Sequence, residues 1–321
     1  MPTQHTLNQL GFAFMILSFS QSVVASSDCD HATDLLFHAY YLYSQGRAVS
    51  QQKLLFNKSL RLCSEMPEVH STLASILEKQ GKDAKAVYHY GQAVRYDKKF
   101  SMAWYGLGEI YYKQKRFPLS LEAHLRACQT DKDSKARAME LLESKRYAFT
   151  EEGDIIDHED LLVLYDGPRR RGLNKMLTDC ELGDVKVQPV HTFFNLIFPI
   201  GEATLPPEAE RQLEEIADAL LKTNSLVKIH GYADNKPYLY RSQAMSDKLN
   251  LGLSQDRATT VATALAQWGV SMDRMEAIGH GVKLLGEGNH KGLPLHYITV
   301  CRGNPTCKAL NLMALGGRLG W

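Results

Sequence analysis

Large and small side chains recur along the first half of the chain at a fixed interval of 34 positions. When residues 67–100 are placed over residues 101–134, large residues meet large ones and small residues meet small ones. The matched pairs are His70 and Trp104, Leu73 and Leu107, Ala74 and Gly108, Leu77 and Tyr111, Ala86 and Ser120, Tyr90 and His124, and Ala93 and Ala127. Self-similarity of this kind predicts repeated helical pairs, each of which buries its apolar face by stacking on its neighbours.

The interval resembles that of the tetratricopeptide repeat, in which helix A and helix B pack antiparallel. Residues 33–66 resemble a weaker first copy, with a slight shift of register around Gly46. Its matching positions are Tyr40, Tyr43, Phe56 and Ser59. Antiparallel packing would bring Cys29, at the start of helix A, close to Cys63, at the end of helix B, so we expect a disulfide between them.

Three repeats need a helix that caps the last exposed face. We predict that this helix begins at Ser134, a favourable N-cap residue, and ends before Lys145. Its expected apolar stripe is Ala136, Ala138, Met139, Leu141 and Leu142. Residues 26–147 are thus expected to form an all-α superhelix. Its function is either to dock an unidentified envelope protein or to act as a spacer, and we favour docking.

The pattern is interrupted between residues 148 and 189, where an acidic stretch precedes the apolar run 161–164. We interpret this segment as a linker with one short helix. The arginines 169–171 lie between Gly167-Pro168 and Gly172, which is more typical of a solvated turn than of a binding patch.

The first 25 residues have the pattern of a signal peptide. A nearly unbroken apolar run covers Leu10–Leu17, and small residues around Ala25 offer a cleavage site. No Lys or Arg precedes the run, so an uncleaved anchor or a misplaced start remains an alternative. Lipidation of Cys29 is not expected, because Asp28 stands where a small residue is needed.

An even number of cysteines, six, behind an export signal indicates disulfides in an oxidising compartment. Cys301 and Cys307 flank a Gly-Asn-Pro turn and are expected to form a short bridge. Cys128 and Cys180 would then pair with each other or stay free. The tail over residues 303–321 is rich in Leu but also in Gly, and is expected to pack on the preceding domain or to bind a partner.

From residue 190 the pattern changes to alternating strands and helices. Strands are predicted over 191–198, 226–229, 274–278 and 295–300, with helices that begin at Pro206-Pro207 and at Ser254. The order βαβαββ predicts an α+β sandwich with both helices on one face of the sheet.

Several motifs in this half resemble, in the right order, the OmpA-like domain shared by OmpA C-termini, Pal and MotB. The resemblance runs over residues 190–302. Its residues are Phe198, Leu205, Gly231-Tyr232-Ala233-Asp234-Asn235 in place of the Gly-His-Thr-Asp motif, Asn250, Leu253, Ser254, Arg257, Ala258, Val261, Leu265, Gly269 and Gly279-His280-Gly281. It implies a peptidoglycan-binding protein in the periplasm of a Gram-negative bacterium, associated with the wall or the outer membrane.

The resemblance also implies that Asp234 and Arg257 hold the diaminopimelate residue of the stem peptide, with Asn250 in support. A carboxylate can accept from the ammonium of diaminopimelate, and a guanidinium can bind its carboxylate with two parallel hydrogen bonds. We further expect Arg257 in the first turn of its helix, where free N–H groups also attract an anion.

The sequence departs from the resemblance in an insertion at 236–248, in Ala233, and in a last strand without the usual arginines. The alternative is therefore a protein-interaction scaffold whose wall site has decayed.

Composition narrows the remaining classes of function. The formal net charge is only +1, so no overall field favours nucleic acid. Nucleophile-elbow, zinc-protease and phosphate-loop motifs are absent, and the histidines are scattered, so we expect no enzyme, no cofactor and no metal site.

Overall fold

The computed structural model describes residues 27–46, 48–151, 153–183, 185–193, 196–233, 238–282 and 296–301. The chain divides into two compact units between Ile110 and Tyr111. The expected signal peptide (1–25), Cys307 and the tail (303–321) lie outside the described residues. Within the described ranges, no helix is both long enough and apolar enough to cross a membrane.

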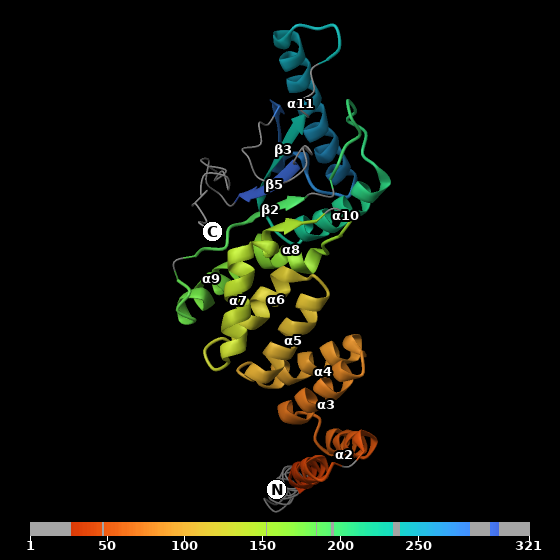
Figure 1. Cartoon of the computed structure of the whole chain (residues 1–321), viewed down its shortest axis with the longest axis vertical. Helices are drawn as coiled ribbons and strands as arrows, with labels where there is room; N and C mark the ends of the chain where they lie inside the picture. The colour runs from red at the N-terminus through yellow and green to blue at the C-terminus, as the bar shows by residue number, and fades with distance from the viewer. Residues whose placement is uncertain are drawn as a thin grey trace, which may run out of the picture. The chain divides into compact units, whose positions relative to one another are not determined.

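The first unit contains the helical pairs predicted from the 34-residue interval (Figure 1). Residues 27–44 are helical and are followed by α2 (Val49–Leu62), α3 (Pro67–Lys79) and α4 (Asp83–Tyr96). Helix α5 (Ser101–Lys113) crosses the boundary, and α6 (Phe117–Ala127) belongs to the second unit. Helices α2, α4 and α6 begin 34 residues apart, so the prediction of repeated pairs is confirmed.

Matching positions on these helices have matching roles. Ser59, Ala93 and Ala127, which are one repeat apart, are each at most 1% exposed. Small side chains at these positions allow the two helices of a pair to approach closely. At Gly106 a Cβ atom would lie 2.2 Å from Cζ of Tyr90, so the glycine makes room for the aromatic ring of the preceding repeat.

A disulfide closes the first pair, joining Cys29 to Cys63 with their Cα atoms 4.9 Å apart. Beside it the Ser59 hydroxyl donates to the carbonyl of Ala32 at 2.8 Å. The short side chain of Ser59 thus ties helix α2 to the helix over residues 27–44.

The capping helix α7 covers Lys132–Ser144, and its N-cap is Asp131, whose side chain accepts from the Ser134 backbone N–H at 2.6 Å. The prediction that Ser134 is the cap was therefore wrong by three positions, since the longer carboxylate of Asp131 reaches the first turn. Ser134 faces inward instead, in line with Ala138, Leu141 and Leu142, whereas Ala136 and Met139 are exposed.

The segment expected to be a linker with one short helix is more structured than predicted. It contains a 3-10 turn η1 (Arg146–Ala148), strand β1 (Phe149–Thr150), helix α8 (His158–Tyr165) and helix α9 (Gly167–Asp179). Its fully buried residues belong to the core that also holds α6 and the sheet: Leu161, Val163, Leu164, Tyr165, Leu173 and Leu177. The prediction of a single helix was therefore wrong.

The buried carboxylate of Glu122 on α6 forms an ion pair with this segment. The carboxylate of Glu122 accepts from Nε and Nη2 of Arg169, at 3.0 and 2.6 Å, and from Arg126 at 2.8 Å. Burial acts to raise the pKa of Glu122, but the bonds from Arg169 and Arg126 hold it below its usual range. Arg169 therefore belongs to helix α9 and to an ion pair, so the prediction of a solvated turn was wrong.

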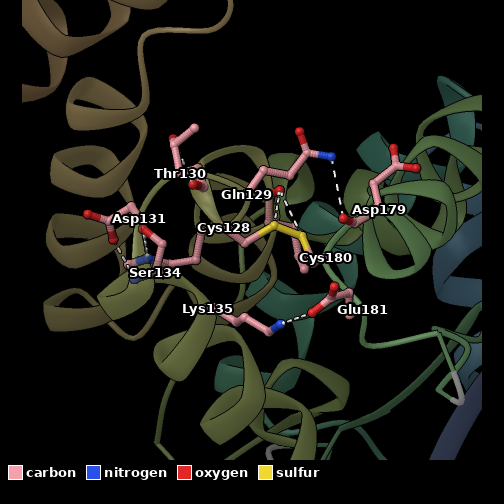
Figure 2. The surroundings of a disulfide bond; sticks show 12 residues. Cys128, Gln129, Thr130, Asp131, Ser134, Lys135, Asp179, Cys180 and Glu181 are labelled. Carbon is pink, nitrogen blue, oxygen red and sulfur yellow. Dashed lines mark hydrogen bonds and ion pairs between the residues drawn. A yellow bond between two sulfur atoms is a disulfide. The ribbon is translucent and has the colours of Figure 1, made fainter.

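A second disulfide joins α6 to α9, as Figure 2 shows. Cys128 follows α6, Cys180 follows α9, and their Cα atoms lie 5.8 Å apart. Lys135 forms an ion pair with Glu181 at 2.8 Å on one side of the bridge. Of the two alternatives for Cys128 and Cys180, the structure shows the pair.

The same segment is bonded to the next helix, α10 (Pro207–Leu221). The side-chain amide of Gln212 both accepts from the Ile156 N–H and donates to its carbonyl, each at 3.0 Å. Glu215 accepts from the His158 backbone N–H at 2.9 Å. Residues 154–158 are thereby held against the C-terminal sandwich.

The sheet contains β1, β2 (Val190–Phe193), β3 (Leu226–Ala233), β4 (Met275–Val282) and β5 (His296–Cys301). Their order is β1-β2-β5-β3-β4. The pairs β1/β2 and β3/β4 are parallel, and β5 is antiparallel to both its neighbours. From β2 onward the described elements follow the predicted order βαβαββ. Strand β2 ends at Phe193, short of the predicted Phe198, and β1 adds a strand that was not predicted.

Candidate functional site

The candidate site lies where the end of β3 meets helix α11 (Gln243–Gln267), which packs across β3 and β4. Two glycines permit this contact. A Cβ atom on Gly231 would lie 2.1 Å from the Ser254 carbonyl oxygen, and one on Gly279 would lie 2.5 Å from the Gln255 nitrogen. Any larger residue on either strand would push the helix away, so the two glycines set the distance between Arg257 and the sheet.

Arg257 is completely buried, and its guanidinium donates to three backbone carbonyls. Nε bonds to Glu202 at 2.8 Å, Nη1 to Tyr232 at 2.9 Å and Nη2 to Pro199 at 2.9 Å. The Phe198 ring lies 5.4 Å from the guanidinium carbon. Arg257 therefore connects the loop after β2 to the end of β3.

Helix α11 begins at Gln243, with Ser242 as its N-cap, so the prediction of a helix that begins at Ser254 was wrong. Arg257 lies well inside the helix, where backbone N–H groups are already bonded, and the expected contribution of a helix N-terminus to anion binding is absent. The first buried positions of α11 are Ser246, Asn250 and Ser254. Because this part of the inward stripe is polar, hydrophobic periodicity did not reveal it.

Of the other two predicted site residues, the structure describes Asn250 and not Asp234. Asn250 lies on the inward face of α11 and is 3% exposed. Asp234 lies outside the described residues and directly follows Ala233, the last residue of β3. The insertion predicted at 236–248 is helical in part, because α11 begins within it.

A histidine pair beside this site was missed by the sequence analysis, which gave His230 no role. Nδ1 of His230 and Nε2 of His280 lie 2.8 Å apart, so at least one ring must be neutral to accept the hydrogen bond. The Tyr232 and His280 rings are stacked with centroids 5.0 Å apart. The signal was the placement of His230 just before Gly231 and of His280 just after Gly279, since these glycines are paired on parallel strands.

A metal site is not evident among these groups. Within the part of the chain that the structure describes, no cluster of three or more His, Cys, Asp or Glu side chains could hold a metal ion. The groups described at the candidate site are the guanidinium of Arg257 and the imidazoles of His230 and His280, which form hydrogen bonds.

Comparison with known proteins finds a family match in each half of the chain. Residues 197–291 match the OmpA family, and residues 74–115 match the TPR repeat. Outer membrane protein P5 of Haemophilus influenzae is 33% identical over 88 residues, which are 27% of this chain and 23% of that protein. The chain thus spans about a quarter of the length of the curated relative it matches.

Two solved structures have low overall similarity. The cell wall anchor of the T6SS from Pseudomonas aeruginosa is 24% identical, with a TM-score of 0.30, over 41% of this chain and 99% of that one. The structure of pilF from Pseudomonas aeruginosa is 15% identical, with a TM-score of 0.29, over 74% of this chain and 91% of that one.

OmpA-like domains typically bind peptidoglycan, and TPR repeats mediate protein interactions. Neither family is enzymatic. The matched region 74–115 lies within the helical repeats, and the matched region 197–291 lies within the α+β sandwich and includes Arg257. The chain therefore combines a region that matches the TPR repeat with a C-terminal region that matches the OmpA family.

Proposed function

We propose that the protein is a non-enzymatic adaptor of the Gram-negative cell envelope. After export by the signal peptide over residues 1–25, it resides in the periplasm, where its C-terminal domain binds peptidoglycan and its repeats bind an envelope protein. The observation that carries the proposal is the position of Arg257, inside the region that matches the OmpA family and bonded to the end of β3. The disulfides Cys29–Cys63 and Cys128–Cys180 support an oxidising compartment.

In this proposal Asp234 accepts from the ammonium of diaminopimelate and Arg257 binds its carboxylate. Arg257 donates to the carbonyl of Tyr232, only two residues before Asp234, which supports a shared site. Arg257 also has a positioning role, because its bonds to Pro199 and Glu202 hold the neighbouring loop. We assign to Asn250 a supporting role from the buried face of α11.

Sedimentation with purified sacculi tests the wall site. We expect the full chain to pellet with sacculi and Asp234→Asn to lose binding about tenfold or more, because a charge-assisted hydrogen bond to the ammonium is lost. Asp256→Asn is the matched control, since Asp256 is exposed and adjoins Arg257 on the same helix. Equal binding by Asp234→Asn and the wild type would sink the assignment of Asp234.

Arg257 needs a gentler substitution than alanine, because removal of its guanidinium leaves three carbonyls without their donors. Arg257→Lys keeps the charge but not the planar fork. We expect weaker binding of soluble diaminopimelate-containing peptide in calorimetry, together with a lower melting temperature. A lower melting temperature with unchanged affinity would restrict Arg257 to its positioning role.

A second candidate function is a protein-interaction scaffold on the same fold. The observation in its favour is the helical extension Gln243–Lys248, which lies within the insertion beside the proposed site. This alternative predicts that the wild-type chain neither pellets with sacculi nor binds the soluble peptide. Either form of binding, reduced in Asp234→Asn, decides against it.

A further inference from the structure

An apolar groove of about 350 Å³ lies in the first unit, between the helix over residues 27–44, α2 and α3. Its apolar side chains are Tyr40, Tyr43, Val49, Phe56 and Ile76. Tyr43 is 69% exposed and Val49 46% exposed, whereas Phe56 is 1% exposed. Exposed aromatic surface next to a hollow is a feature of binding sites rather than of ordinary solvated helices.

Lysine side chains lie around Gln80, one of the residues that line this groove. Lys79 lines it, and the Gln80 side-chain oxygen accepts from Nζ of Lys53 at 3.4 Å and from Nζ of Lys82 at 3.2 Å. The groove lining contains no Asp or Glu. Among the described residues, none of these three lysines forms an ion pair with a carboxylate.

A second hollow, of about 370 Å³, continues beyond Gln80 and is lined by Ser50, Lys53, Leu54 and Asn57 as well as by Gln80 itself. Gln80 lines both hollows, so it stands between the aromatic groove and a second hollow lined mostly by polar residues, Lys53 among them. A ligand that occupies both compartments must present an apolar group on one side and a group that suits ammonium and amide donors on the other.

We infer that this groove binds a partner protein through a segment in which an aromatic or large aliphatic side chain is followed closely by a carboxylate. The apolar side chain enters between Tyr40, Tyr43 and Ile76, where its burial removes the exposed surface of Tyr43 from water. The carboxylate meets Lys79 and Lys53, whereas a basic segment would be repelled. The inference rests on the proposed role of the repeats in protein binding. It specifies the chemistry of the segment that the first two repeats bind.

Selection from a phage-displayed library of random peptides against the whole oxidised chain tests this inference. We expect the selected peptides to share an aromatic or large aliphatic residue next to Asp or Glu. Synthetic, fluorescein-labelled versions should bind in anisotropy measurements, more weakly as salt increases. A selection with no enrichment over the starting library, or one that yields basic peptides, would overturn the inference.

Matched variants locate the binding. Lys53→Glu/Lys79→Glu should weaken the labelled peptides about tenfold or more, and Tyr43→Ser should weaken them several-fold. Lys58→Glu is the control. Lys58 is exposed and belongs to the same helix, α2, but it lines neither hollow. Unchanged affinity in the double variant would overturn the inference.

The outcomes also separate this inference from the proposed function. Sacculus binding should be unchanged in Lys53→Glu/Lys79→Glu, because the wall site is on the other unit. If peptides bind the wild type and the double variant equally, protein binding lies elsewhere on the repeats. The inference about the groove is then wrong, and the proposed adaptor function is unaffected. If the wild-type chain does not bind sacculi, the proposed adaptor function is wrong, whereas the inference about the groove is unaffected.

Discussion

Two helical pairs in this protein, α3–α4 and α8–α9, are similar in form but are held together differently. The α3–α4 pair packs through alanines that are completely buried, Ala74, Ala86 and Ala93. The α8–α9 pair packs through leucines, among them Leu161 and Leu173, and is also fastened to α6 by a disulfide and by the ion pair of Glu122 with Arg169. The first pair follows a repeat pattern, whereas the second depends on bonds to distant parts of the chain.

This difference shows where sequence patterns are informative. A repeat buries the same positions in every copy, so a regular interval reports a helical pair even when each copy is irregular. A helical pair without copies leaves no such interval. The α8–α9 pair includes Gly167, Pro168 and Gly172, which favour turns, and its stability comes from partners that are close only after folding.

The largest expected effect is on the second pair. Replacement of both Cys128 and Cys180 by alanine should lower the free energy of unfolding of the second unit by about 4 kcal/mol, because the bridge closes a long loop. Hydrogen exchange should show lost protection in α8 and α9 and unchanged protection in α3 and α4. Equal loss in both pairs would show that the comparison is wrong.

The ion pair should have the next largest effect. Glu122→Gln should destabilise the second unit by about 3 kcal/mol, since Arg169 and Arg126 keep their charges and lose their buried carboxylate. Glu143→Gln, at an exposed position of α7, should change stability by less than about 0.5 kcal/mol. Urea denaturation of the two variants measures the difference, and similar values for both would contradict a structural role for Glu122.

In the repeats, two glycines should give effects of opposite sign. Gly106→Ala should destabilise by about 2 kcal/mol, because the new methyl group collides with the Tyr90 ring. Gly91→Ala, inside α4 with no atom within 4 Å of the added methyl group, should stabilise by about 0.5–1 kcal/mol through helix propensity. Thermal unfolding compares them, and destabilisation by both would contradict the packing described between repeats.

The smallest expected effect depends on pH. Burial, and secondarily the neighbouring His70, lowers the pKa of His89 to about 4, while its unfolded value is 6.5. The unfolded state therefore binds more protons between these values, and stability is lost as the pH falls from about 6.5 to about 4. Because His89 is only half-buried, we expect about 1 kcal/mol after screening by solvent. His89→Gln should be less sensitive to pH in this window, and an equal loss would exclude His89 as the cause.

The candidate site also contains contacts between distant residues that no local sequence pattern reports. The motif around Gly231 and Arg257 predicted an OmpA-like fold, and the family match confirms it. The start of α11 was misplaced because Ser246, Asn250 and Ser254 are polar although they face inward. This error put Arg257 in a first turn, and the bonds of Arg257 to three carbonyls could not be foreseen from its neighbours in sequence.

The sequence by itself determined the helical repeats, the order of strands and helices in the C-terminal half, and the pairing of Cys29 with Cys63 across one repeat. These features follow from periodicity and local spacing, which each short segment carries on its own. Only the tertiary structure decided that residues 148–189 join the core, that Glu122 holds Arg169, and that Arg257 lies inside a helix. The physical reason is that these groups are buried beside partners far away in the sequence, Glu122 beside Arg169 and Arg257 beside the Glu202 carbonyl, which no local pattern reports.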